Sequence, residues 1–199
     1  TLINAGDLSV EIAGTYKDVL FLGGDDTMDF HVDTGSFTGL ADGGAAGNDS
    51  LILRAGTGNS GSADLSQFIN FETLDIKGGG EVTVTNTHDT NLTASTMEDD
   101  GTTLIVASGA AIDVDITAGA AGQSLIIDGD VSGAVDMAAG DDTVAINLDT
   151  GSFTGSSMTG GAGTDTLRYT SAFDQTIGTT TFNSFEALDL TGDALYTIT

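Results

Sequence analysis

Glycine and aspartate recur together along the chain in a pattern that suits the binding of a hard cation. Residues 160–168 read GGAGTDTLR, and residues 44–52 read GAAGNDSLI. Glycine lets backbone carbonyl groups converge on an ion, and aspartate supplies the anionic oxygen that Ca²⁺ prefers. We therefore expect Ca²⁺ at these turns. The candidate ligands, chosen because they recur at matched positions, are Asp26, Asp49, Asp142, Asp165, Gly160 and Gly163.

The same aspartates have a purely structural interpretation, in which each one caps a solvent-exposed turn. Two of them belong to acidic doublets, Asp25–Asp26 and Asp141–Asp142. Adjacent carboxylates repel each other unless a cation or hydrogen-bond donors lie nearby. The residues alone leave both interpretations open.

A second motif with catalytic potential occurs once in each half of the chain. Residues 31–36 read HVDTGS and residues 147–152 read NLDTGS, and Asp-Thr-Gly-Ser is the signature of aspartic proteases. Those enzymes need their two carboxyl groups within about 3 Å of each other. No Tyr-bearing flap follows either copy, and the identity of the copies continues through FTG, which a catalytic loop does not require. We interpret Asp33 and Asp149 as turn residues between strands.

Other candidate residues carry weaker signals. His31 and His88 are the only histidines, neither recurs in the other half, and no G-x-S-x-G elbow accompanies them. We interpret both as structural or surface residues. Phe37 and Phe153 recur at equivalent turns, where they could contact a sugar or fill a corner of the core.

Short apolar packets must position these turns. Segments such as EVTVT (81–85) and TVAINL (143–148) alternate apolar with polar residues, which is the pattern of a strand with one buried face. Glycine, aspartate, asparagine, serine and threonine separate the packets, and no segment shows sustained helical spacing. The sequence predicts an all-β fold.

An internal repeat indicates the architecture. Residues 24–51 align without a gap with residues 140–167, at an offset of 116, and NFETLDIKG (70–78) matches SFEALDLTG (184–192). We expect a parallel β-helix or β-roll solenoid, in which each coil buries its apolar row against its neighbours. The alternative is two tandem β-sandwich-like domains. The expected division is repeat 1 at 1–80, connecting coils at 81–134 and repeat 2 at 135–199.

Composition excludes several classes of partner. The 199 residues include 30 acidic and 4 basic side chains, for a net charge of -26. We expect neither nucleic-acid binding nor membrane insertion, because few cations could meet phosphates and no apolar run approaches a membrane span of roughly 18 residues. Without cysteine there is no disulfide framework. The first ten residues lack signal-peptide features, so we expect a mature piece or a segment of a longer protein.

The ordered set of motifs resembles repeats in bacterial surface proteins. GDDT, then GGAGTDTL, a Thr- and Gly-rich loop and NFExLxxxG are similar to repeats of autotransporter passengers and of RTX-bearing S-layer and giant adhesin proteins. That resemblance implies a β-solenoid, an extracellular location, calcium between successive turns, and a structural or adhesive role without catalysis. The chain departs from the RTX pattern because it has one nonapeptide per unit and no tandem array.

These observations lead to three functions in order of preference. The first is a non-enzymatic extracellular structural segment of a bacterial adhesin, S-layer or filament, stabilised by Ca²⁺. Its expected partners are neighbouring coils or subunits stacked end to end, because the edge strands of a solenoid need covering. The second is a module of a secreted carbohydrate-active protein that binds Ca²⁺ and a glycan. The third is an aspartic protease.

Overall fold

The alternating packets form strands with one buried side in a computed structural model of the chain, which describes residues 2–4, 6–177 and 182–198. In β5 (Thr27–His31), Met28 and Phe30 are buried, whereas the intervening residues are partly exposed. The same alternation occurs in β8 (Ser50–Arg54), β12 (Glu81–Thr85) and β20 (Thr143–Asn147). One side of each strand therefore faces a common interior.

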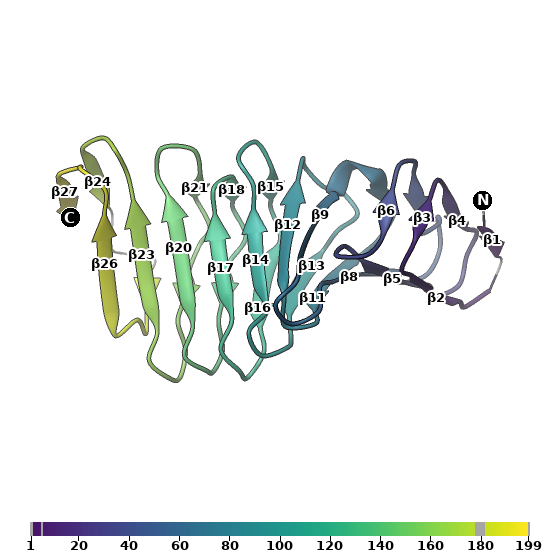
Figure 1. Cartoon of the computed structure of the whole chain (residues 1–199), viewed down its shortest axis with the longest axis horizontal. Helices are drawn as coiled ribbons and strands as arrows, with labels where there is room; N and C mark the ends of the chain where they lie inside the picture. The colour runs from purple at the N-terminus through teal and green to yellow at the C-terminus, as the bar shows by residue number, and fades with distance from the viewer. Residues whose placement is uncertain (1, 5, 178–181, 199) are drawn as a thin grey trace.

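Two long parallel sheets stack these strands along the molecule, with the two termini at opposite ends (Figure 1). The first sheet has nine strands, in the order β2 (Ser9–Ile12), β5, β8, β11 (Thr73–Lys77), β13 (Ala94–Met97), β16 (Asp115–Ala118), β19 (Val135–Asp136), β22 (Met158–Thr159) and β25 (Phe182–Asn183). The second has seven strands, in the order β9 (Ser60–Asp64), β12, β14 (Thr103–Val106), β17 (Ser124–Ile127), β20, β23 (Thr166–Thr170) and β26 (Ala187–Thr191).

Three shorter sheets close the third side of the coils. They contain β1 (Leu2–Asn4), β4 (Val19–Phe21), β7 (Ala41–Asp42) and β10 (Phe68–Ile69); β15 (Ala111–Ile112), β18 (Asp130–Val131) and β21 (Ser152–Phe153); and β24 (Gln175–Ile177) and β27 (Tyr196–Ile198). A separate pair, β3 (Thr15–Tyr16) and β6 (Ser36–Phe37), lies on the side of the seven-stranded sheet in the first two coils. Helical structure in the described ranges is limited to a 3₁₀ turn at Leu65–Gln67. No helix there has the length and apolar character that crossing a membrane requires.

The prediction of a parallel β-solenoid is therefore confirmed, and the alternative of two β-sandwich-like domains is wrong. Strands that follow one another in a sheet are one coil apart in sequence, and their pairing is parallel, as in the register Leu51 to Leu74 and Val144 to Leu167. Residues 81–134 contribute strands to both long sheets, so the stack continues through the segment that links the repeats.

Columns of apolar side chains fill the interior. One column in the nine-stranded sheet passes through Met28, Leu51 and Leu74, all of which are buried. Burial of each such side chain contributes roughly 1.5–3 kcal/mol. Aromatic rings pack at one end of this interior, where Phe37 stacks on Phe68 with ring centroids 5.6 Å apart. The core is thus a continuous stack in which each coil covers the previous one.

The two sequence repeats lie on different sides of the solenoid, which the alignment does not indicate. Five coils after Met28, its column in the nine-stranded sheet reaches Val135. The residue that corresponds to Met28 in the repeat is Val144, nine residues later, and it lies in β20 of the seven-stranded sheet. The offset of 116 residues is therefore five coils and part of a sixth, so the second repeat is rotated by one side.

Candidate functional site

The four predicted aspartate ligands occupy equivalent corners. Each lies directly before a strand whose alternate side chains face the interior. Asp26 precedes β5, Asp49 precedes β8, Asp142 precedes β20 and Asp165 precedes β23. Each of the four is at most 1% exposed. Their side chains point into the stack. A residue that only caps an exposed turn would instead lie on the solvent-facing side.

In the first repeat, these carboxylates form a ladder of hydrogen bonds from coil to coil. The backbone N–H of Leu8 donates to Asp26 Oδ1 at 2.8 Å, and the N–H of Asp26 donates to Asp49 Oδ1 at 2.7 Å. The N–H of Asp49 then donates to Glu72 Oε2 at 2.7 Å. Each carboxylate thus satisfies a backbone donor of the preceding coil at a corner where the sheet hydrogen bonds are interrupted.

The second repeat carries the same ladder. The backbone N–H of Gln123 donates to Asp142 Oδ1 at 2.7 Å, and that of Asp142 donates to Asp165 Oδ1 at 2.9 Å. The N–H of Asp165 donates to Glu186 Oε2 at 2.8 Å. The repeat therefore preserves a chain of charge-assisted hydrogen bonds, which are stronger than bonds between neutral groups.

Glu72 and Glu186 are members of these ladders that the sequence analysis did not select as site residues. They belong to the repeated F-E-x-L-D segment, and a signal was present in the spacing. Asp26, Asp49 and Glu72 follow one another at intervals of 23 residues, which is the length of a coil at that point. A search for acidic residues at coil spacing would have found them.

One oxygen of each buried aspartate has no hydrogen-bond partner among the described residues. These atoms are the Oδ2 oxygens of Asp26, Asp49, Asp142 and Asp165. Burial raises the pKa of Asp26, Asp49 and Asp142, because a carboxylate loses its hydration there. An unpartnered buried anion is costly, so each Oδ2 is chemically suited to receive a proton, a water molecule or a cation.

The glycines of these corners are required by the stacking itself. Gly47 and Gly163 have φ values of +122° and +153°, which disfavour residues with a side chain. A Cβ atom at either position would lie 1.7 Å from the carbonyl oxygen of Gly24 or Gly140 in the preceding coil. The close approach of successive turns therefore explains these glycines whether or not an ion binds.

The outer members of the acidic doublets point toward the following coil. Asp25 Oδ1 accepts the backbone N–H of Asn48, and Asp141 Oδ1 accepts that of Thr164, both at 2.9 Å. Within each doublet, one carboxylate accepts a backbone N–H of the preceding coil and the other accepts a backbone N–H of the following coil. Hydrogen-bond donors thus oppose the mutual repulsion of the two charges.

A cation at these corners could not be held by side chains alone. The described part of the chain contains no group of three or more histidine, aspartate or glutamate side chains arranged to hold a metal ion. Ca²⁺ takes six to eight oxygen ligands, among them backbone carbonyls and water. A buried Oδ2 could supply one anionic ligand, and the remaining ligands would come from the carbonyl groups of turns such as the one that contains Gly160.

The two Asp-Thr-Gly-Ser motifs form turns that cap the next coil. Asp33 Oδ2 accepts the backbone N–H of Gly56 at 3.0 Å and the side-chain amide of Asn59 at 2.9 Å, and these bonds lower its pKa. Asp149 Oδ2 accepts the N–H of Ala172 at 2.8 Å. Asp33 follows β5 and Asp149 follows β20, in different sheets and about five coils apart, so the structure does not bring the two carboxylates together.

The remaining candidates engage in local contacts. His31 Nε2 lies 3.1 Å from Glu11 Oε1, and the largely buried His88 Nε2 lies 2.8 Å from Asp113 Oδ1. Phe37 and Phe153 are partly buried and pack against the core.

A groove of about 430 Å³ lies beside the first Asp-Thr-Gly-Ser turn. The ring of Phe37 and the side chains of Ser62, Asp64 and Gln67 are among its lining residues. Comparison with known protein families, with curated proteins and with solved structures finds no match to this chain.

Proposed function

We propose that the chain is an extracellular, non-enzymatic structural segment of a bacterial surface protein, such as an adhesin, an S-layer protein or a filament. The observation that carries this proposal is the use of the acidic turn residues. Asp26, Asp49 and their counterparts in the second repeat bond one coil to the next. Such residues hold successive coils together in order. Because they lie on successive coils, they do not converge on one reaction centre.

Calcium is the proposed stabilising ion. The four buried Oδ2 atoms, which have no partner among the described residues, support this proposal, because they occur at matched positions of the two repeats. Ca²⁺ bound to the folded chain alone would stabilise it by mass action. The net charge of -26 has the same implication, since cations would reduce the repulsion among 30 acidic side chains.

Titration calorimetry with CaCl₂ at neutral pH tests the calcium proposal. We expect saturable binding that Asp49→Asn and Asp165→Asn each reduce, whereas the exposed-site variant Asp193→Asn leaves it unchanged. Absence of saturable binding at millimolar Ca²⁺ would contradict the calcium part of the proposal. The structural part is then tested separately, through the rod shape of the chain by small-angle X-ray scattering.

The groove beside Phe37 supports a second candidate function, a glycan-binding module of a secreted carbohydrate-active protein. An aromatic ring next to hydroxyl, amide and carboxylate groups offers both an apolar face and hydrogen-bonding partners. Binding of soluble polysaccharide that is lost in Phe37→Ala and retained in Phe153→Ala would favour this candidate. If neither variant alters binding, or no polysaccharide binds, the groove has no such role.

A further inference from the structure

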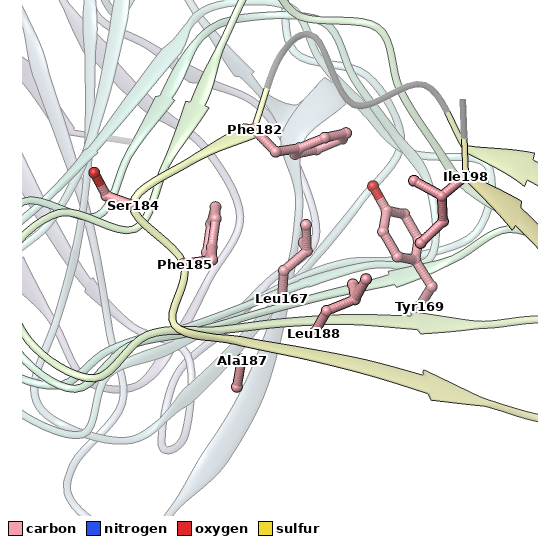
Figure 2. A pocket seen from close by; sticks show the side chains of 8 residues that line it. All are labelled: Leu167, Tyr169, Phe182, Ser184, Phe185, Ala187, Leu188 and Ile198. Carbon is pink, nitrogen blue, oxygen red and sulfur yellow. The ribbon is translucent and has the colours of Figure 1, made fainter.

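The C-terminal end of the solenoid carries an open apolar hollow. Its volume is about 200 Å³, and Leu167, Tyr169, Phe182, Phe185 and Leu188 are among the residues that line it. Figure 2 shows these side chains directed toward one space, while Ala187 points away from it on the outer side of β26. The interior of the last coil is therefore accessible from the end of the stack.

The first repeat contains the same hollow in a filled state. Leu51, Phe68, Phe71 and Leu74 correspond to Leu167, Phe182, Phe185 and Leu188, and they line a cavity of only about 10 Å³. His88, Asp89 and Leu92, which come from the following coil, complete its lining. The repeat thus shows within one molecule what covers this hollow, namely a further coil.

Without a covering coil, the leucines of β26 are exposed to solvent, whereas the matched residues of β11 are buried. Leu74 and Ile76 of β11 are 1% and 0% exposed, whereas Leu188 and Leu190 of β26 are 49% and 39% exposed. Strand β13 pairs with β11 in parallel, with Leu74 opposite Ser95 and Ile76 opposite Met97. Within the described residues, β26 has β23 on one edge and no strand on the other. A parallel strand at the free edge would bury both leucines.

The N-terminal end of a second copy offers such a strand on the matching side. Strand β2 is the first strand of the sheet that contains β5, β8 and β11, and β26 is the last of the corresponding strands β20, β23 and β26. Because the second repeat is rotated by one side, the side of the stack that ends in β26 at the C-terminal end corresponds to the side that begins with β2 at the N-terminal end. A copy shifted along the axis and turned about it by one side would present β2 to β26 in parallel.

We propose that copies of this chain associate head to tail, with β2 of one copy continuing the seven-stranded sheet beyond β26 of another. The register follows from the pairing of β11 with β13. Ser9 lies opposite Ala187, Val10 opposite Leu188 and Ile12 opposite Leu190. The contact is heterologous and does not close, so it generates a filament. This inference deepens the proposed structural function and rests on it.

The acidic side chains at the two ends make this contact depend on ionic strength. Glu11 of one copy comes beside Asp189 of the other, and Arg168 Nε lies 2.7 Å from Asp189 Oδ2. Within the chain, Glu11 is likewise paired in register with Asp29, where His31 and Arg54 supply the positive charge. Because both ends are acidic overall, association strengthens with ionic strength, which screens the repulsion.

Disulfide trapping tests the register. The chain has no cysteine, and register partners on adjacent strands have a Cα separation suited to a disulfide. Ser9→Cys and Ala187→Cys, both at exposed outward positions, are mixed and oxidised in high salt. We expect mainly the mixed dimer, identified by mass. Glu11→Cys mixed with Ala187→Cys is the matched control, two residues out of register, and yields little. Predominance of either homodimer, or no excess over the control, overturns the proposal.

Sedimentation velocity provides a second test that does not depend on cysteine. Leu188→Asp would place a charge in the apolar contact, and we expect it to weaken association by about tenfold or more. Ser108→Asp, at an exposed turn between β14 and β15 in the middle of the stack, leaves association unchanged. A wild-type chain that remains monomeric at high concentration and high salt overturns the proposal. That result leaves the calcium titration and the rod shape intact, so the two proposals fail separately.

Discussion

Asp49 Oδ1 accepts the backbone N–H of Asp26, one coil away, at a distance of 2.7 Å. The contact joins two residues of the same type at the same corner, and Asp142 and Asp165 repeat it at 2.9 Å. Acidic residues that repel each other in sequence are thus converted into links between coils, because each carboxylate faces a backbone donor.

Removal of one link should destabilise the stack. Asp49→Ala leaves the N–H of Asp26 buried without an acceptor, which costs about 1–3 kcal/mol. Asp49→Asn keeps the accepting Oδ1 and should cost less. The measurement is the free energy of unfolding in urea with EGTA present, and Asp193→Ala is the exposed control. Equal stability of Asp49→Ala and wild type would show that the ladder contributes nothing.

Acid should stabilise the calcium-free protein. The pKa values of Asp26, Asp49 and Asp142 are raised by burial, so the folded state binds protons more tightly than the unfolded chain does. Their contribution to stability is complete below the unfolded pKa and is lost as pH rises through the folded pKa. Asp33 and Asp64 have the opposite sign, because hydrogen bonds lower the pKa of each.

With three raised pKa values against these two lowered ones, whose loss of stability falls below the unfolded pKa, we expect the urea midpoint in EGTA to rise as pH falls from 7 toward 4.5. The triple variant with asparagine at positions 26, 49 and 142 should lose this rise. A midpoint that falls steadily with acidification in the wild type would contradict the assignment of these carboxyl groups.

Glycine at the stacked corners should be irreplaceable. Gly47→Ala introduces a Cβ that would collide with the Gly24 carbonyl oxygen and also forces a side chain into a positive φ, so we expect a loss of about 2 kcal/mol or more. Gly109→Ala, at a φ of +83° where a Cβ would meet no atom within 4 Å, serves as control. Thermal melting of both variants distinguishes stacking from a general preference for glycine in turns.

The matched leucines offer a comparison inside one molecule. Leu74→Ala removes a fully buried side chain and should cost about 2–5 kcal/mol. Leu188→Ala, at the equivalent position of the uncovered last coil, should cost about 0.5 kcal/mol or less at low protein concentration. Urea unfolding of the two variants measures the difference. Similar costs would mean that the C-terminal coil is already covered in solution.

Much of the fold could be predicted from the chain, because a strand buried on one side imposes a visible alternation. Packets such as residues 81–85 and 143–147 became strands, and the 116-residue repeat indicated stacked coils. The rotation of the second repeat was not predictable in the same way. It depends on the summed lengths of five coils, which vary with each loop, and an alignment records only the total offset.

The sequence indicated that the candidate aspartates share equivalent positions, and it indicated less of how they are arranged there. Glycine and aspartate at fixed spacing indicated convergent turns, and the aspartates do occupy equivalent corners. The sequence could not show that their side chains point inward, since only the partner donors in the preceding coil determine that direction. Glu72 and Glu186 are found in the sequence only when acidic residues are compared at the spacing of a coil, because their partners are 23 and 21 residues away in the chain.

Thermal melting at pH 7 in millimolar Ca²⁺ and in EGTA tests the central claim most directly. Free Ca²⁺ at a hundredfold excess over the dissociation constant of one site adds about 2.7 kcal/mol, which corresponds to a rise in Tm of about 5–11 °C for a chain of this size. We predict such a rise for the wild type and its loss in the double variant Asp49→Asn, Asp165→Asn. Identical melting curves in Ca²⁺ and EGTA would contradict the account.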